Sequence, residues 1–459
     1  MLRTDRIAKP GLASPLAMST RWLVPVAAIG AALTMAEPAL AAVEGETAFV
    51  FNSFSFLVNG FLVMWMAAGF AMLESGLVRS KNVATICLKN IALYSLAGIM
   101  YLVMGYNLMY DGVDGGWIGS LSIWSADDSA ALADAFPTGD DAPAYAATSD
   151  WFFQMVFVAT AASIVSGTLA ERIKLWPFLI FVVVLTGVIY PIQGAWHWGA
   201  GWLSEAGFND FAGSTIVHSV GGWAALTGAV ILGARRGKYS KDGRVQPMPG
   251  SSLPLATLGT FVLWLGWFGF NGGSQLALGS AADVIAIANI FANTNMAAAG
   301  GVLAAMLASQ FMFKKIDLSM SLNGAIGGLV SITAGPDTPA MLEAVLIGGV
   351  GGVLVVVTVP LLDKLKIDDV VGAIPAHLVC GIWGTLAVPL TNDGASFLAQ
   401  IIGIVTVGAF VIVLSTIVWL ALKFTIGIRA SEEDEALGLD RAELGMEAYP
   451  EFGQGSQRI

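Results

Sequence analysis

Long apolar segments separated by short polar connections run through most of this 459-residue chain. About 20 apolar residues are enough to cross the hydrocarbon core of a bilayer as a helix, and a helix satisfies its backbone hydrogen bonds internally. Segments of this kind fall at residues 49–73, 88–109, 151–170, 175–195, 211–234, 252–271, 282–312, 318–335, 340–362, 370–390 and 397–424. The pattern predicts an all-α polytopic membrane protein with eleven transmembrane helices.

Positive charges alternate between the connections of these segments. Lysine and arginine collect in loops on the cytoplasmic side of a membrane protein. Here they follow the odd-numbered segments, and the connections after the even-numbered segments contain none. We therefore expect the connection at 235–250 and the C-terminal tail in the cytoplasm. The acidic connection at 111–150 is expected outside as a solvated loop, together with the N-terminus of the mature chain.

Residues 1–41 show the order of features found in a secretory signal peptide. Basic residues precede an apolar stretch at 22–36, and a small-x-small site, Ala39-Leu-Ala41, follows it. Because the stretch is shorter than a full span, we expect cleavage that leaves Ala42 at the start of the mature chain. An uncleaved extra span is the alternative interpretation, and Met18 is an alternative start.

The mature chain is then a transmembrane domain at 42–428 followed by a polar tail at 429–459. The tail has the composition of many disordered interaction segments, with one possible short helix. The net charge of −11 comes mostly from this tail and from the connection at 111–150, so it indicates no particular partner. Cys87 and Cys380 fall in apolar segments, which predicts two small buried side chains and no disulfide.

Composition and missing motifs exclude several classes of function. Hydrophobic residues make up 56% and charged residues 12% of the chain, and its 54 glycines suit helices whose backbones approach closely. The sequence contains no Gly-x-x-x-x-Gly-Lys-Ser/Thr phosphate loop, no His-Glu-x-x-His and no carboxylate in the central part of any predicted span. We therefore expect no enzymatic activity and no ATP-driven pumping. We also expect no cofactor, no metal ion and no nucleic-acid partner.

Two histidines stand at matching places in the chain. Asp210 opens the fifth apolar segment and His218 follows eight residues later; Asp369 and His377 repeat that spacing at the tenth. An ionisable side chain within a span is a candidate functional residue. With the aspartates as helix N-caps, each imidazole lies roughly 12 Å deep, from opposite faces of the membrane. The two rings then lie within about 6 Å of each other along the membrane normal, near the midplane. A single histidine satisfied by a neighbouring carbonyl would be the simpler alternative.

The opposite directions of these two segments indicate an inverted repeat. Transporters built this way form their sites near the midplane, between the two halves. The halves are predicted at about 49–234 and 252–390, and residues 397–424 form an extra, eleventh helix. Five plus five helices plus one is therefore the expected architecture.

Aromatic residues are expected at the outer end of the same path. Phe157 lies about 10 Å into the third span, Phe270 ends the sixth and precedes Ser274, and Trp198 precedes the fifth. Aromatic faces attract cations. The alternative is an ordinary interfacial aromatic belt, to which we also assign His197.

Four motifs resemble the ammonium transporter family (Amt/Mep/Rh). They are Asp210-Phe-Ala-Gly-x-Thr-x-Val-His218, Gly266-Trp-Phe-Gly-Phe-Asn-x-Gly-Ser274, Gly167-x-Leu-Ala-Glu-Arg172, and the tail sequence Gly427-Ile-Arg with Gly438-Leu-Asp440. The resemblance covers essentially the whole mature chain. It implies eleven helices in a five-plus-five inverted repeat, and trimers with one pore in each subunit.

The resemblance also implies roles for the outer residues. Trp198 and Ser274 would bind ammonium on the external side, with Phe157 beside them. Phe157 and Phe270 would form a stacked gate. Ammonium would be deprotonated there, and neutral ammonia would continue along an apolar pore, which excludes potassium because that ion has no proton to lose.

Deeper in the pore, the resemblance implies that His218 and His377 are a pair and that Asp210 is a carboxylate that shapes the entrance without binding substrate. Asp369 would be its structural counterpart. One departure concerns Gly372-Ala-Ile-Pro-Ala-His377, where many members have Asp-Val-x-x-Val-His. Because Pro375 lacks an N–H group, we expect it to remove a helix hydrogen bond from the pore wall near His377.

The expected function is import of ammonium or ammonia across a bacterial cytoplasmic membrane by a homotrimer embedded in the lipid bilayer. The tail resembles the part that docks a PII-type signal protein. An ammonium sensor that signals through its tail with little flux is the main alternative. A channel for water or small neutral solutes is the third, although it gives no reason for the external Trp-Ser site.

Overall fold

The computed structural model describes residues 45–139 and 142–452. The predicted signal peptide and the last seven residues of the tail lie outside the described residues. Within the described part, the chain is helical apart from its connections and two isolated β-bridges. The prediction of an all-α membrane protein is confirmed.

The first half of the chain supplies the first five apolar segments. Its elements are α2 (Gly45–Leu77), η1 (Ser80–Asn82), α3 (Val83–Met100), η2 (Tyr101–Gly105), α4 (Tyr106–Tyr110), α5 (Ala147–Thr168), α6 (Leu175–Val184), η4 (Leu185–Ile189), α7 (Tyr190–Ala195), α8 (Trp202–Glu205), η5 (Ser214–Ser219) and α9 (Val220–Leu232). The segments η2, η4 and η5 are π-helical turns inside longer helices.

The second half supplies the remaining six segments and the tail. Its elements are α10 (Leu253–Gly273), α11 (Ala281–Phe313), α12 (Leu318–Ile332), α13 (Met341–Lys364), η6 (Ile374–Val379), α14 (Cys380–Ala387), η7 (Val388–Leu390), α15 (Phe397–Thr425), α16 (Glu432–Leu437) and α17 (Leu439–Leu444). The turn η6 is also π-helical.

Nine helical segments of the described residues are long and apolar enough to cross a membrane. Two shorter apolar helices, at Leu318–Ile332 and Ile374–Leu390, occupy the places of the eighth and tenth predicted spans. All eleven predicted segments are thus helical, while the count of eleven crossings stays a prediction.

Glycine allows two helix pairs to pack at short distance. A β-carbon built on Gly259 of α10 would lie 2.4 Å from the backbone nitrogen of Leu73 in α2. A β-carbon on Gly348 of α13 would lie 2.0 Å from the carbonyl oxygen of Ala297 in α11. Neither position has room for a larger residue, which accounts for part of the high glycine content.

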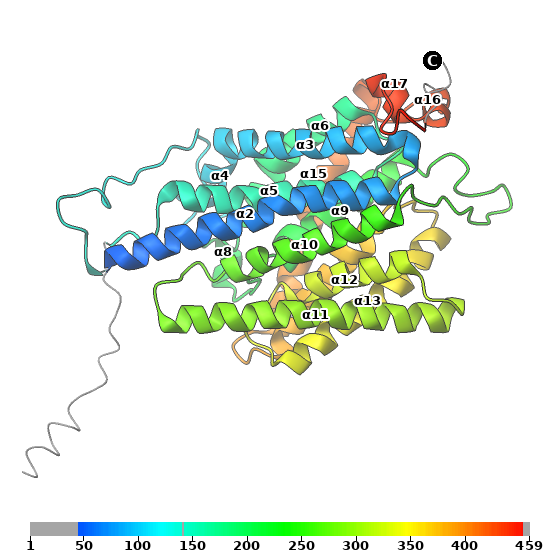
Figure 1. Ribbon diagram of the computed structural model, residues 1–459. Helices are drawn as coiled ribbons and strands as arrows, with labels where there is room; N and C mark the ends of the chain where they lie inside the picture. The colour runs from blue at the N-terminus through cyan, green and yellow to red at the C-terminus, as the bar shows by residue number, and fades with distance from the viewer. Residues whose placement is uncertain (1–44, 140–141, 453–459) are drawn as a thin grey trace, which may run out of the picture. The chain divides into compact units, whose positions relative to one another are not determined.

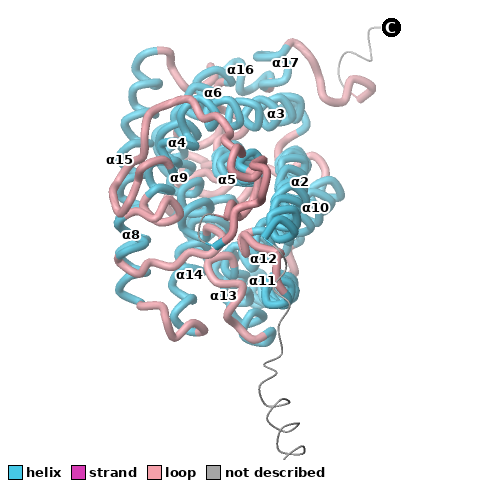
Figure 2. Tube along the Cα trace, turned by 90° about the vertical axis from the view of Figure 1, so that its left-hand side faces the viewer, coloured by secondary structure: helices cyan, strands magenta, loops and turns pink. Residues whose placement is uncertain are grey.

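The two ends of the helix bundle carry different connections. Figure 1 shows the connection at 111–146 beside the start of α2, whereas the connection at 235–250 and the tail helices lie at the opposite end. Figure 2 shows α5 well inside the bundle, and most of its side chains are buried. The alternating positive charges predicted that the connections at 111–150 and 235–250 would lie on opposite sides of the membrane, and they lie at opposite ends of the bundle.

The end that carries the tail contains a buried ionic cluster. Arg235 donates two hydrogen bonds to the Asp368 carboxylate, at 2.8 and 2.9 Å, and its Nη1 lies 3.3 Å from the Glu171 carboxylate. Burial alone would raise the pKa of Asp368, but hydrogen bonds from Arg235 and the charge of Arg172 outweigh burial and hold it well below its usual range. The cluster joins the connections that follow α5, α9 and α13.

The described part of the tail is folded against this end of the bundle. The Asp440 carboxylate accepts hydrogen bonds from the backbone N–H groups of Ala84 and Thr85, at 3.0 and 2.7 Å. Lys81 donates to two carbonyl groups of α16, each at 2.7 Å. The composition of the tail suggested disorder with one possible short helix, but the described part of the tail forms two short helices, α16 and α17. Its Asp440 carboxylate accepts hydrogen bonds from backbone N–H groups in the first turn of α3, which have no partner within the helix.

The expectation for the cysteines is half correct. Cys380 is buried, but Cys87 is exposed on α3. A thiol is apolar enough to face lipid from the outside of the bundle, so an apolar segment does not by itself place a cysteine inside.

Candidate functional site

Two equivalent turns position the histidines. The carboxylate of Asp210 accepts four backbone hydrogen bonds at 2.8 to 3.0 Å, from the N–H groups of Gly213 and of the first three residues of η5, Ser214, Thr215 and Ile216. Asp369 accepts from the backbone of Gly372 at 3.2 Å and of Ile374 at 2.8 Å, at the start of η6. An aspartate that accepts these otherwise unpaired N–H groups fixes where the helix begins.

A glycine follows each aspartate after three residues. Gly213 has a φ of +107° and Gly372 a φ of +79°, in the region that disfavours other residues. A β-carbon on Gly213 would also lie 2.5 Å from the Val217 side chain. The repeated unit is therefore Asp-x-x-Gly followed by a π-helical turn that carries the histidine.

The two histidines meet. Nδ1 of His218 lies 3.2 Å from Nδ1 of His377, and the ring centroids are 5.3 Å apart. His218 is fully buried and His377 is 4% exposed. One ring must donate and the other accept, which requires at least one neutral imidazole. In the described structure Nε2 of His218 is buried and has no hydrogen-bond partner.

Pro375 does not disturb this pair. It occupies the first turn of η6, where an N–H group would have no partner within the helix. The departure from the usual motif is therefore accommodated at a position where proline causes no loss of a helix hydrogen bond.

Aromatic rings continue the path outward from His218. Phe270 lies 5.2 Å from His218 between ring centroids, and Phe157 stacks on Phe270 at 4.0 Å. Trp198 meets Phe157 edge-on at 6.0 Å. Both phenylalanines are buried, and their stacked rings lie between Trp198 and His218 in this series of ring contacts.

Outside this stack lies a cavity of about 350 Å³, which Phe157, Trp198 and Ser274 line together. The indole N–H of Trp198 donates to the Asp210 carbonyl at 3.0 Å, and the Ser274 hydroxyl donates to the Phe270 carbonyl at 2.9 Å. The indole is thus held in place, and the serine oxygen keeps lone pairs for a donor in the cavity.

His197 is held beside this cavity by the same aspartate. Its Nε2 accepts the backbone N–H of Asp210 at 3.2 Å, and burial lowers the pKa of His197 to about 4. The residue is half-buried, and its assignment to an interfacial aromatic belt stays a prediction.

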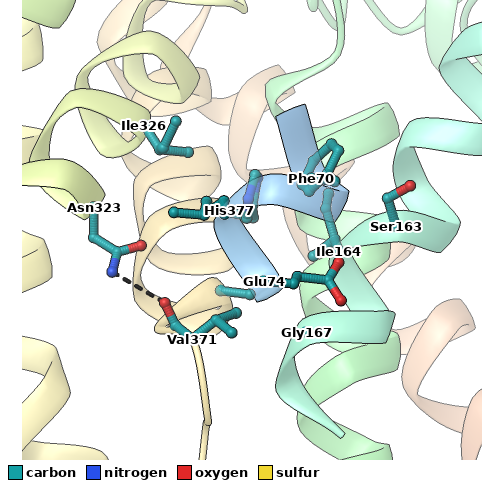
Figure 3. A pocket seen from close by; sticks show the side chains of 11 residues that line it. Phe70, Glu74, Ser163, Ile164, Gly167, Asn323, Ile326, Val371 and His377 are labelled. Carbon is teal, nitrogen blue, oxygen red and sulfur yellow. Dashed lines mark hydrogen bonds between the residues drawn. The ribbon is translucent and has the colours of Figure 1, made fainter. Parts of the chain in front are cut away.

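A smaller cavity lies at the other side of the histidine pair. Its volume is about 10 Å³, close to the space that one water needs. Figure 3 shows Phe70 and Glu74 projecting from one segment of α2, while His377 and Ile326 reach the same cavity from other elements. Glu74 is 1% exposed and one of its oxygens has no hydrogen-bond partner in the described structure.

Glu74 is paired indirectly with another buried charge. Its second carboxylate oxygen accepts from the Ser166 hydroxyl at 2.7 Å, and the Lys89 ammonium donates to the Ser166 carbonyl at 2.9 Å. Glu74 directly follows the first predicted span at 49–73, and Lys89 lies at the start of the second at 88–109. The helices α2 and α3 bury both side chains.

Two further residues of the outer cavity were not predicted as site residues. Asp150 falls at the end of the connection expected at 111–150, and Tyr106 falls in the second predicted span; both line the cavity with Tyr110 and Tyr145. Tyr145 comes from the connection at 111–150, which therefore does more than form a solvated loop. The spacing of Asp150 from Phe157, which places them on one helix face, was the available signal.

Comparison with known proteins gives consistent results. Residues 54–449 match the model of the Ammonium Transporter Family. Ammonium transporter Amt2 of Archaeoglobus fulgidus is 39% identical over 426 residues, covering 86% of this chain and 87% of that protein. The ammonium transporter of Bacillus subtilis is 31% identical over 426 residues, covering 88% and 98%.

Solved structures share the fold. A structure described as a Sensor Amt Protein has a TM-score of 0.79 and 34% identity, covering 86% of this chain and 99% of that one. Mep2 from Candida albicans has a TM-score of 0.75 and 27% identity, covering 88% and 91%. The match to the family model spans most of the chain, and the chain belongs to the ammonium transporter family.

Proposed function

We propose that this protein carries ammonium, as ammonia, across the bacterial cytoplasmic membrane. The observation that carries the proposal is the line of contacts from Trp198 through Phe157 and Phe270 to the His218–His377 pair. A cavity lined by aromatic rings lies at one end of this line, and two buried imidazoles lie at the other.

Ammonium first enters the outer cavity. The face of Trp198 attracts the cation, and the Ser274 oxygen accepts one of its N–H bonds. Phe157 and Phe270 then oppose entry of a charged species, because an ion loses its hydration between two apolar rings. Loss of one proton to water in the cavity leaves neutral ammonia, which passes the rings at far lower cost.

Beyond the gate, the histidine pair supplies hydrogen bonds to ammonia. Nε2 of His218 faces no protein partner in the described residues, and the bond between the two Nδ1 atoms holds the rings in fixed tautomers. Potassium has no proton to lose, so it is stopped where ammonium is deprotonated. Asp210 and Asp369 hold the two π-helical turns and do not bind substrate.

The proposal includes the assembly and its surroundings. The chain forms a homotrimer in the cytoplasmic membrane after removal of residues 1–41, with the N-terminus outside and the tail in the cytoplasm. A PII-type signal protein binds at the cytoplasmic face. The alternating positive charges support the orientation, and the tail folded beside the connection at 235–250 supports the position of the partner.

An ammonium sensor is the second candidate, favoured by the likeness to the Sensor Amt Protein. Purified protein in proteoliposomes separates the alternatives. An ammonium gradient should evoke a rise in internal pH if ammonia alone crosses, and an inward current if the proton follows by a separate route. Binding of ammonium without current or pH change would refute transport and favour the sensor.

A further inference from the structure

Asp150 is a buried carboxylate in the outer cavity. It lies in the first turn of α5 and is 6% exposed. One oxygen accepts the hydroxyl of Tyr106 and the other accepts the side-chain amide of Gln154 at 3.3 Å. Asp150, Gln154 and Phe157 follow one another at helical spacing, so they share one face of α5.

No basic side chain compensates this carboxylate. Within residues 45–139 and 142–452, none of the ion pairs involves Asp150. A buried carboxylate without a counter-charge is costly unless it is paired or neutralised. The remaining free space beside it is the cavity itself, so a counter-cation can arrive only as a solute.

Aromatic rings surround the space beside the carboxylate. Tyr106 and Tyr110 lie 5.1 Å apart between ring centroids, and both line the cavity with Tyr145. The hydroxyl of Tyr110 is buried and has no hydrogen-bond partner in the described structure. A cation with N–H donors would satisfy the carboxylate by charge, the hydroxyl by a hydrogen bond, and the rings by cation–π attraction.

We propose that Asp150, with Tyr106 and Tyr110, forms a second cation site that collects ammonium or a small alkylammonium ion before it reaches Trp198 and Ser274. This site deepens the proposed function and rests on it. Asp150 precedes Phe157 by seven residues, which places the site about 10 Å outward of the stacked rings. The two sites share one cavity, so a captured cation reaches Trp198 without leaving it.

A purely structural role for Asp150 gives a different expectation. A carboxylate in the first turn of a helix also stabilises that helix through the macrodipole. Asp283 provides the matched control, because it lies in the first turn of α11 and bonds to the Ser280 hydroxyl at 2.7 Å but does not line the cavity. Asp283 also accepts from the Gln275 side-chain amide at 3.1 Å, and Gln275 is not among the residues that line the cavity. Asp283→Asn therefore changes a carboxylate in the first turn of a helix without changing a direct partner of the cavity-lining residues.

The test measures ammonium-evoked transport in proteoliposomes across a range of ammonium concentrations. Asp150→Asn should raise the half-saturating concentration about tenfold, as expected for removal of one nearby charge, and should change it more than the maximal rate. Asp150→Glu should restore most of the affinity, and Asp283→Asn should leave it unchanged. Equal half-saturating concentrations in Asp150→Asn and wild type would overturn the second site.

A second variant keeps the test decisive if Asp150→Asn fails to fold. Tyr110→Phe removes only a hydroxyl that has no protein partner, so the fold should be retained. It should raise the half-saturating concentration two- to threefold, and an unchanged value would overturn the proposed contact. Absence of transport by the wild-type protein would instead refute the proposed function, so the two failures are distinguishable.

Discussion

Replacing His218 by alanine tests the paired-histidine pore most directly. The change removes the partner of His377 at 3.2 Å and also a ring that stacks on Trp267 at 4.9 Å. A buried nitrogen left without its hydrogen bond costs about 1–3 kcal/mol. If this cost falls on the step that limits flux, ammonium transport should drop roughly 5- to 150-fold.

The space left by the missing imidazole should also change which ions the pore excludes. Alanine leaves a gap beside Phe270 that water can fill through the unpaired nitrogen of His377. A wetter path lowers the cost of passing a cation, so a potassium current should appear that the wild-type protein lacks. An acidic residue at position 218 offers a polar partner again, and it should be tolerated better than alanine or leucine.

Currents carried by ammonium and potassium in the two single variants and the double variant provide the assay. Residues that act as a pair give losses that do not add. His197→Ala is the matched control, because that ring lies outside the pair and bonds to the backbone of Asp210; its effect should add to that of His377→Ala. Wild-type flux and selectivity in His218→Ala, or simple additivity of the His218 and His377 losses, would refute the reasoning.

Four further predictions concern the end of the bundle that carries the tail. Asp368→Asn should lower the melting temperature at pH 7 through loss of a buried pair with Arg235, worth about 3–5 kcal/mol. The folded protein holds the pKa of Asp368 below its usual range. The stabilisation by this carboxylate is therefore complete above about pH 4 and is lost as the pH falls further. A difference in melting temperature between variant and wild type that stays constant down to pH 2 would contradict this. Asp440→Ala should release the tail from the start of α3, and the released tail should be cleaved faster in limited proteolysis. Deletion of residues 429–459 should abolish pull-down of a PII-type protein. Undiminished pull-down would exclude the tail as the contact of that protein. Cysteine introduced at Ser240 should not react with an impermeant reagent in intact cells, and labelling there would reverse the assigned orientation.

The sequence was sufficient for those features that depend on local chain geometry. Eleven apolar segments predicted the helices, and the equal spacing of Asp210 to His218 and Asp369 to His377 predicted that the two histidines would be neighbours. This spacing is informative because each residue of a helix advances the chain by about 1.5 Å, so the number of residues gives the depth of a side chain below the start of the helix. An aspartate that caps a helix therefore sets how far inside the bundle its histidine lies.

The cavities could not be predicted, because they depend on how distant segments meet. Tyr106 reaches Asp150 from the end of the second span, and Tyr145 comes from a connection whose composition indicated only solvent exposure. Glu74 and Lys89 were missed for another reason. Glu74 directly follows an apolar segment, where a charged residue is typical of a loop. The contacts of both charges with Ser166 and of the Lys89 ammonium with the Phe178 ring depend on how distant helices meet.

The π-helical turns at the two histidines also determine which single-residue deletions the protein can tolerate. A π-helical turn contains one residue more than an α-helical turn, and both η5 and η6 begin at an Asp-x-x-Gly unit. Loss of one codon inside either turn would restore α-helical winding and rotate every later side chain of that helix by about 100°. The histidine would then leave its partner although no residue had been substituted. Single-residue deletions, which surface connections tolerate, should therefore be among the most damaging changes at 214–219 and 374–379.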